Sequence, residues 1–161
     1  MSGDSTALTI RGGDTASRRR LQHALEQHAP TSAISRAVVI ANGQPTEATL
    51  LESGALACRQ AISDRLLQAA AEATQMIAGM RDTAGGRLVL ILPAGDGLAD
   101  SAVRGGLTSF VRSAAVAFAR DGVAVNAIVG DIANDDVGEL AGAASFLLSA
   151  EAAPMVGQVL P

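Results

Sequence analysis

The stretch Arg87-Leu88-Val89-Leu90-Ile91-Leu92 is the most hydrophobic run in the sequence, and it decides the class of fold. Gly85-Gly86 precede it and Pro93 follows it, so the run has the length and the boundaries of a strand. A strand with apolar residues on both sides is typical of a parallel sheet that helices cover on both faces. The sequence therefore predicts an α/β domain.

Other strands and helices alternate on both sides of this run. Long helical patterns cover about 46–81, with a break near Ser53-Gly54, and 100–120. The remaining expected elements, in chain order, are a strand over 6–11, a helix from Asp14 or Thr15 to about His28, a strand over 36–41 bounded by Asn42-Gly43, a strand over 123–129, a helix over 136–149 and a strand over 155–160. About five strands and four helical segments predict one flavodoxin-like parallel sheet with right-handed crossovers.

The composition excludes several classes of function. The chain has 161 residues, of which 48% are hydrophobic, and its net charge of -4 argues against a nucleic-acid partner. No apolar run approaches the roughly 20 residues that span a bilayer, and the first residues do not resemble a secretory leader. The single Cys58 suits a reducing compartment, so we expect a cytoplasmic protein without a membrane partner.

Two residue types that enzymes often use are missing. The sequence contains no tyrosine and no lysine, so its 12 basic residues are all arginine. A tyrosine acid and a lysine Schiff base are therefore excluded. His23 and His28 lie five residues apart on an expected surface helix, which is not the i,i+4 spacing of metal ligands. We expect no metal site.

The end of the chain carries a specific likeness. Phe146 to Ala152 (FLLSAEA) and Val156 to Leu160 (VGQVL) resemble the terminal helix and last strand of the short-chain dehydrogenase/reductase family. Val125-Asn126-Ala127-Ile128 followed by Gly130 resembles the strand that usually reads VNAI-P-G. Gly86 to Val89 resembles the strand that carries the catalytic serine, and Val39 to Gly43 takes the place of the NNAG strand. The resemblance begins near Ser35 and implies a Rossmann-like fold.

The resemblance also implies that the family's reaction is lost. Asp100 stands where the family has its catalytic Tyr, and Arg104 stands where it has the Lys. The serine position falls near Leu92 or Pro93, and the asparagine position falls at Arg65. An Asp is ionised at neutral pH and has no proton to give. Asp100 and Arg104 are instead expected to form an i,i+4 ion pair on one helix.

The family's dinucleotide turn, TGxxxGxG, is also incomplete. The best match starts at Arg11 and keeps Gly12, but the second and third glycines become Ala16 and Arg18. A side chain at Arg18 would fill the place where the backbone must approach phosphate. We interpret the run Arg18-Arg19-Arg20 as a solvated helix face, with an anion site as the alternative.

The spacing before the NNAG strand leaves room for one helix, whereas the family has two further strands and a helix there. The chain therefore resembles a single truncated domain of this family over residues 1–161, without the half of the sheet that receives adenosine. We expect no cofactor.

The surfaces that assemble the family's oligomers are better preserved. In the family, the helix that carries Tyr and Lys pairs across a twofold axis, and the terminal helix and strand form a second contact. The residues that would make these contacts here are Gly105, Gly106, Phe110, Ala114 and Phe118 on the first helix, and Phe146, Leu147 and Val159 at the end. The alternative is that they face only their own core.

Three hypotheses remain. The first is a non-catalytic subunit that pairs with and supports an active short-chain dehydrogenase, such as a ketoacyl or hydroxyacyl thioester oxidoreductase. The second is a stand-alone homodimeric binding module without redox activity. The third is an enzyme with changed chemistry, built on Asp96, Asp100, Arg104 and Asp131 at expected strand ends and helix starts. This third hypothesis predicts a closed polar pocket with a buried carboxylate.

Overall fold

The structure is a computed structural model, and it describes residues 8–28, 34–41, 50–82, 85–132 and 137–161. The strands are β1 (Leu8–Gly12), β2 (Ser35–Ile40), β3 (Gly86–Leu92), β4 (Val123–Val129) and β5 (Val159–Leu160). The helices are α1 (Thr15–Glu26), α2 (Leu50–Arg81), α3 (Leu98–Phe118) and α4 (Val137–Leu148), with short 3-10 turns η1 (Ala119–Asp121) and η2 (Ala150–Ala152). No helix in these ranges is long and apolar enough to cross a membrane.

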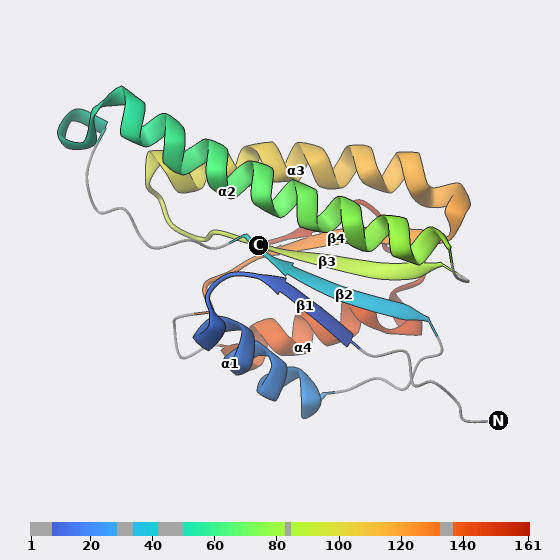
Figure 1. Ribbon diagram of the computed structural model, residues 1–161. Helices are drawn as coiled ribbons and strands as arrows, with labels where there is room; N and C mark the ends of the chain where they lie inside the picture. Colours follow the sequence, from blue (N-terminus) through green and yellow to red (C-terminus); the bar gives the residue numbers. More distant parts are fainter. Residues whose placement is uncertain (1–7, 29–33, 42–49, 83–84, 133–136) are drawn as a thin grey trace.

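All five strands are parallel and form one sheet in the order β1-β2-β3-β4-β5. Helices α2 and α3 cover one face of this sheet, and α1 and α4 cover the other (Figure 1). This three-layer arrangement confirms the predicted Rossmann-like α/β fold with flanking helices.

The handedness of the connections differs from the prediction. Every connection steps in the same direction, from β1 towards β5, yet two of the four helices lie on each face. Connections that step the same way on opposite faces have opposite hands, so two of the four crossovers are left-handed and the prediction was wrong for them. Packing accounts for the sheet face on which α1 lies, because α2 already contacts β1, β2, β3 and β4 on the other face. Open apolar surface remains beside α4, where Leu21 and Leu25 of α1 become buried.

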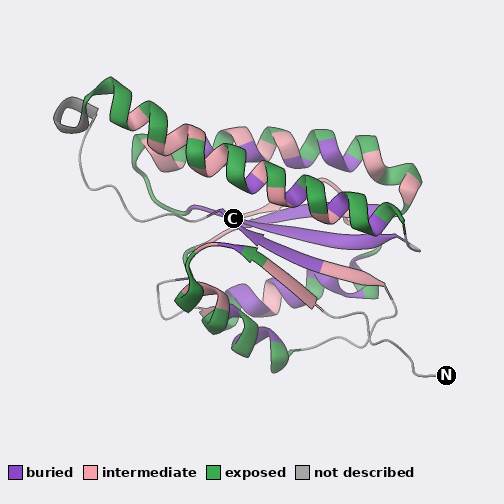
Figure 2. Cartoon of the chain, viewed as in Figure 1, coloured by how far each residue is buried: buried purple, intermediate pink, exposed green. Residues whose placement is uncertain are grey.

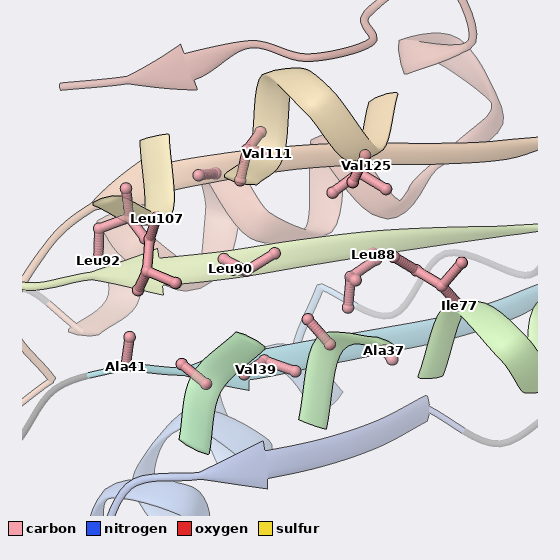
Figure 3. Close-up of a cluster of buried hydrophobic side chains, with 14 of the residues drawn as sticks. Ala37, Val39, Ala41, Ile77, Leu88, Leu90, Leu92, Leu107, Val111 and Val125 are labelled. Atoms are coloured by element: carbon pink, nitrogen blue, oxygen red, sulfur yellow. The ribbon is translucent and has the colours of Figure 1, made fainter. Parts of the chain in front are cut away.

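The core is built around β3, in which all seven residues are buried (Figure 2). Leu88, Leu90 and Leu92 point towards α2 and α3, where they meet residues such as Leu107 and Val111 (Figure 3). The alternate residues Val89 and Ile91 point to the opposite face and pack with α1 and α4. The period of two along a strand therefore supplies both cores from one sequence run.

Most element boundaries agree with the prediction. Asp14 caps α1, and Gly54 (φ 73°, ψ 155°) interrupts α2 where a break was expected. The expected strand over 155–160 is shorter, since β5 spans only Val159 and Leu160. Before β5, Gly157 N donates to Val125 O and Gln158 O accepts from Ala127 N. The Asn126 side chain accepts from Gln158 N and donates to Met155 O. The predicted turn at Asn42-Gly43, the first positions of the helix expected from 46, and Asp136 lie outside the described residues.

Gly12 at the end of β1 offers a direct test of this packing. Its φ is +71°, and a Cβ there would collide with the carbonyl oxygen of Ile40 on the neighbouring strand. We expect Gly12→Ala to lower the free energy of unfolding by at least about 2 kcal/mol, measured by urea denaturation. The control is Gly79→Ala in α2, where a Cβ meets nothing within 4 Å. There we expect a gain of up to about 1 kcal/mol, and equal losses at both sites would contradict the described packing.

Candidate functional site

The residues at the predicted catalytic positions gather where α3 begins. The backbone leaves β3 at Leu92, passes Pro93 and enters α3 at Leu98. Asp100 therefore lies in the first turn of α3, and Arg104 follows one turn later. A carboxylate in the first turn interacts favourably with the positive end of the helix dipole.

Asp100 forms its ion pair with Arg65 of α2. Arg65 Nη1 lies 2.6 Å from Asp100 Oδ1, and the two side chains are only 15% and 23% exposed. The predicted i,i+4 pair between Asp100 and Arg104 is therefore wrong. The reason is that α2 and α3 pack closely here, with the side chain of Leu66 about 3.0 Å from the point where a Cβ of Gly106 would lie. The family resemblance carried a signal for this pair, because it places Arg65 and Asp100 at two positions of one active site.

Arg104 turns back to the loop that precedes its helix. Its Nη1 donates to the carbonyl oxygens of Pro93 at 2.8 Å and Gly95 at 2.9 Å. Leu92 and Pro93, at the serine position, are buried and carry no hydroxyl group. The positions of the family's Asn, Ser, Tyr and Lys thus form internal ties between α2, α3 and the loop 93–97.

The turn between β1 and α1 is closed in a similar way. Asp14 accepts from Ser17 N at 2.8 Å and from Ser17 Oγ at 3.1 Å. The hydrogen bond from the Ser17 backbone, followed by that from its hydroxyl, lowers the pKa of Asp14 below its ordinary value of 3.8. This carboxylate is therefore ionised at neutral pH. It places a negative charge at the helix N-terminus, where a phosphate would otherwise bind.

Arg18 completes the closure of this turn. Its Nη1 donates to the carbonyl oxygens of Gly12 at 3.1 Å and Gly13 at 2.9 Å, and Nη2 donates to Thr15 Oγ1 at 3.2 Å. Arg19 and Arg20 on the same helix are exposed. With the Asp14 carboxylate at the helix end and the Arg18 side chain folded onto the glycines, the turn does not fit a pyrophosphate.

The space beside this turn is small. A cavity of about 30 Å³ lies between the turn and α2, lined by Gly12, Gly13, Ile40, Ala41, Arg65, Gln68, Ala69 and Glu72. That volume is about one water molecule's share of liquid water, whereas ligand pockets usually measure hundreds of Å³. In the described sheet β1 is the edge strand and the strand order never reverses. The described sheet therefore lacks the switch point at which dinucleotides bind in such folds.

The remaining candidate residues do not converge on a pocket. Asp96 and Asp131 are exposed, and neither lines the cavity beside Arg65. His23 and His28 are exposed as well. Among the described residues, Asp96, Asp100, Arg104 and Asp131 therefore do not form the closed polar pocket that is expected of an enzyme with changed chemistry.

The expected interface residues fall into two groups. Ala114 and Leu147 are buried in the chain's own core, and Phe110, Phe118 and Val159 are half-buried against it. The Phe118 ring also lies under the Arg81 guanidinium, 5.8 Å from its centroid. Gly106 contacts Leu66 of α2, whereas Gly105 is exposed and Phe146 is 45% exposed.

Known structures share this arrangement. No family model and no curated protein matches the sequence. The structure aligns with an oxidoreductase of the short-chain dehydrogenase/reductase family from Brucella ovis, in complex with a partially ordered NAD. The TM-score is 0.69 with 14% identity, over 95% of this chain and 97% of that chain. The fold is that of the short-chain dehydrogenases/reductases.

Two further short-chain dehydrogenase/reductase structures agree. An oxidoreductase of this family from Burkholderia thailandensis aligns at a TM-score of 0.65 with 24% identity, over 90% of this chain and 67% of that chain. A short chain dehydrogenase from Mycobacterium smegmatis aligns at 0.61 with 18% identity, over 90% of this chain and 63% of that chain. The short-chain dehydrogenase/reductase fold is thus present here, and the residues predicted for its catalytic positions, Arg65, Asp100 and Arg104, make internal ties.

The strength of the tie between α2 and α3 can be measured by a double-mutant cycle. We expect Arg65→Met and Asp100→Asn each to lower the free energy of unfolding by about 1–3 kcal/mol, because each leaves a half-buried charge without its partner. The loss in the double variant should be smaller than the sum of the two single losses, by on the order of 1 kcal/mol.

The control for this cycle is the ion pair between Arg81 and Asp121, whose side chains are 52% and 34% exposed. We expect a coupling of about 0–1 kcal/mol there, because solvent screens the charges. A coupling no larger at Arg65 and Asp100 than at this exposed pair would show that the first pair is not a structural tie.

Proposed function

We propose that this chain is a non-catalytic subunit with the short-chain dehydrogenase/reductase fold, which pairs with and supports an active short-chain dehydrogenase. By analogy with the family, the active partner would be a ketoacyl or hydroxyacyl thioester oxidoreductase. The observation that carries the first half of this proposal is the use of Arg65, Asp100 and Arg104 as internal ties. Groups that hold helices and a loop together are not available to a substrate carbonyl.

The chemistry of these groups supports the proposal. Reduction of a carbonyl needs a proton donor, and an aspartate is ionised at neutral pH. Asp100 is also engaged by the Arg65 guanidinium at 2.6 Å. The sequence contains no tyrosine or lysine that could replace it. The closed turn at Asp14 and Arg18 supports the same conclusion for cofactor binding.

The outer surface of α2 and α3 supports pairing with another chain. Five large hydrophobic side chains are exposed in the described ranges, and four of them lie on these two helices. They are Leu56 (60% exposed), Leu67 (66%), Leu98 (54%) and Val116 (82%). Single exposed apolar residues are normal, but a concentration on one layer is typical of a surface that another protein covers. The fifth, Phe146, lies on α4.

A stand-alone homodimeric binding module is the second candidate. The observation that favours it is a pocket at the amino end of the sheet, which holds the buried Arg87. A twofold homodimer would cover the same α2 and α3 surface with a second copy. The two candidates therefore differ in the identity of the covering chain.

The native mass of the protein isolated from its own host, with bound chains retained, separates the two candidates. We expect a complex that contains this chain and a second, larger dehydrogenase chain. A mass of two or four identical copies would overturn the subunit proposal and leave the homodimeric module.

The covering surface can be tested in the same measurement. We expect Val116→Asp and Leu67→Asp to release the second chain, because each places a charge in a contact that excludes water. The control is Ala16→Asp, at an exposed position in the first turn of α1, where an acidic residue is compatible with the helix dipole. Retention of the second chain in both α2 and α3 variants would mean that the contact lies elsewhere.

A further inference from the structure

Arg87 is a buried arginine for which the described residues provide no counter-ion. It is the second residue of β3, and only 9% of its surface is exposed. Its Nε and Nη1 atoms are buried and have no hydrogen-bond partner. None of the ion pairs among the described residues includes Arg87. These two donor groups are therefore unused in the part of the chain that the structure describes.

Burying a guanidinium without an anion beside it lowers the free energy of unfolding. A guanidinium stays charged in proteins, so it cannot escape burial by losing its proton. Burial lowers the pKa of Arg87 below its ordinary value, which reflects the same loss of solvation. An anion bound at Arg87 would compensate this loss.

A pocket lies next to this side chain. It has a volume of about 300 Å³ at the amino end of the sheet, and Arg87 is its only charged lining residue. The rest of its wall is apolar or glycine, including Ile34, Ala119, Ala124, Ala153 and Val156. This edge is opposite to the turn at Gly12, which ends its strand. The pocket is therefore distinct from the region described above.

The pocket continues into a second, largely apolar groove. The groove has a volume of about 490 Å³ and shares Ala119 and Val156 with the pocket. It extends along the end of α3 past Ala115 and the exposed Val116, and Arg112 is its one charged lining residue. The pocket with Arg87 at one end and the groove along α3 at the other fit a molecule that has a charged head and an apolar tail.

We propose that this pocket binds a small carboxylic acid with an aliphatic chain. The carboxylate accepts hydrogen bonds from the free donors of Arg87, and the chain passes Ala119 and Val156 towards Val116. A carboxylate carries a single charge, which matches the one guanidinium that lines the pocket. The acid would bind independently of any nicotinamide cofactor.

Calorimetric titration of the full chain with sodium octanoate tests this proposal. We expect saturable binding of one octanoate per chain. Butyrate should bind on the order of ten- to a hundredfold more weakly, because it buries fewer methylene groups. Octanol should also bind at least about tenfold more weakly, because it lacks the charge that Arg87 recognises. Equal affinity for octanol, no binding of octanoate, or tighter binding of inorganic phosphate than of octanoate would each overturn the proposal.

Three variants locate the site. Arg87→Met should weaken octanoate binding at least about tenfold. It should still fold, because it replaces a buried unpaired charge with an apolar side chain of similar length. Ala153→Phe leaves the charge in place and should weaken binding by filling the pocket. Arg120→Met is the control, since Arg120 is exposed and does not line the pocket. Binding that is unchanged in both Arg87→Met and Ala153→Phe would place octanoate elsewhere and refute the site.

Discussion

The whole structure depends on the complete burial of β3. Its alternate side chains supply both hydrophobic cores, so every helix on either face packs against a layer that this strand helps to form. A strand buried on both faces must have neighbours on both edges, which β2 and β4 provide in parallel register. The same constraint explains why Arg87, the second residue of this strand, is buried although nothing in the described chain neutralises its charge.

Much of the fold could be predicted from local sequence. The run from Arg87 to Leu92 identifies a buried strand, Asp14 identifies a helix cap, and Gly54 identifies a helix break, because each depends on residues close together in the chain. The hand of the crossovers could not be predicted, because it depends on which sheet face the other helices leave open. The backbone before β5 also depends on a distant residue, since the Asn126 side chain bonds to Met155 O and Gln158 N.

The candidate site also has features that local sequence predicts and features that depend on residues far apart in the chain. The absence of tyrosine and lysine from this sequence can be seen without a structure. The partner of Asp100 was assigned from helical spacing, but the closest opposite charge comes from Arg65, 35 positions earlier. Arg87 was counted as the polar start of a hydrophobic run. Its burial follows from the connection around Gly122 and from the residues after η2, which no local pattern reveals.

The position of α1 has a consequence for how the chain acquires its structure. Leu21 and Leu25 pack in the same core as Leu140 and Leu147, and Ser145 donates to the backbone carbonyl of His28 across 117 positions. During synthesis on the ribosome, β1 and α1 therefore leave the exit tunnel long before the surface that covers them has been made. Their apolar face must wait until α4 has been made, so closure of this layer is a late folding event with a large loop-closure cost. Helix α1 is in this sense translated well before α4 but reaches its native environment only together with it.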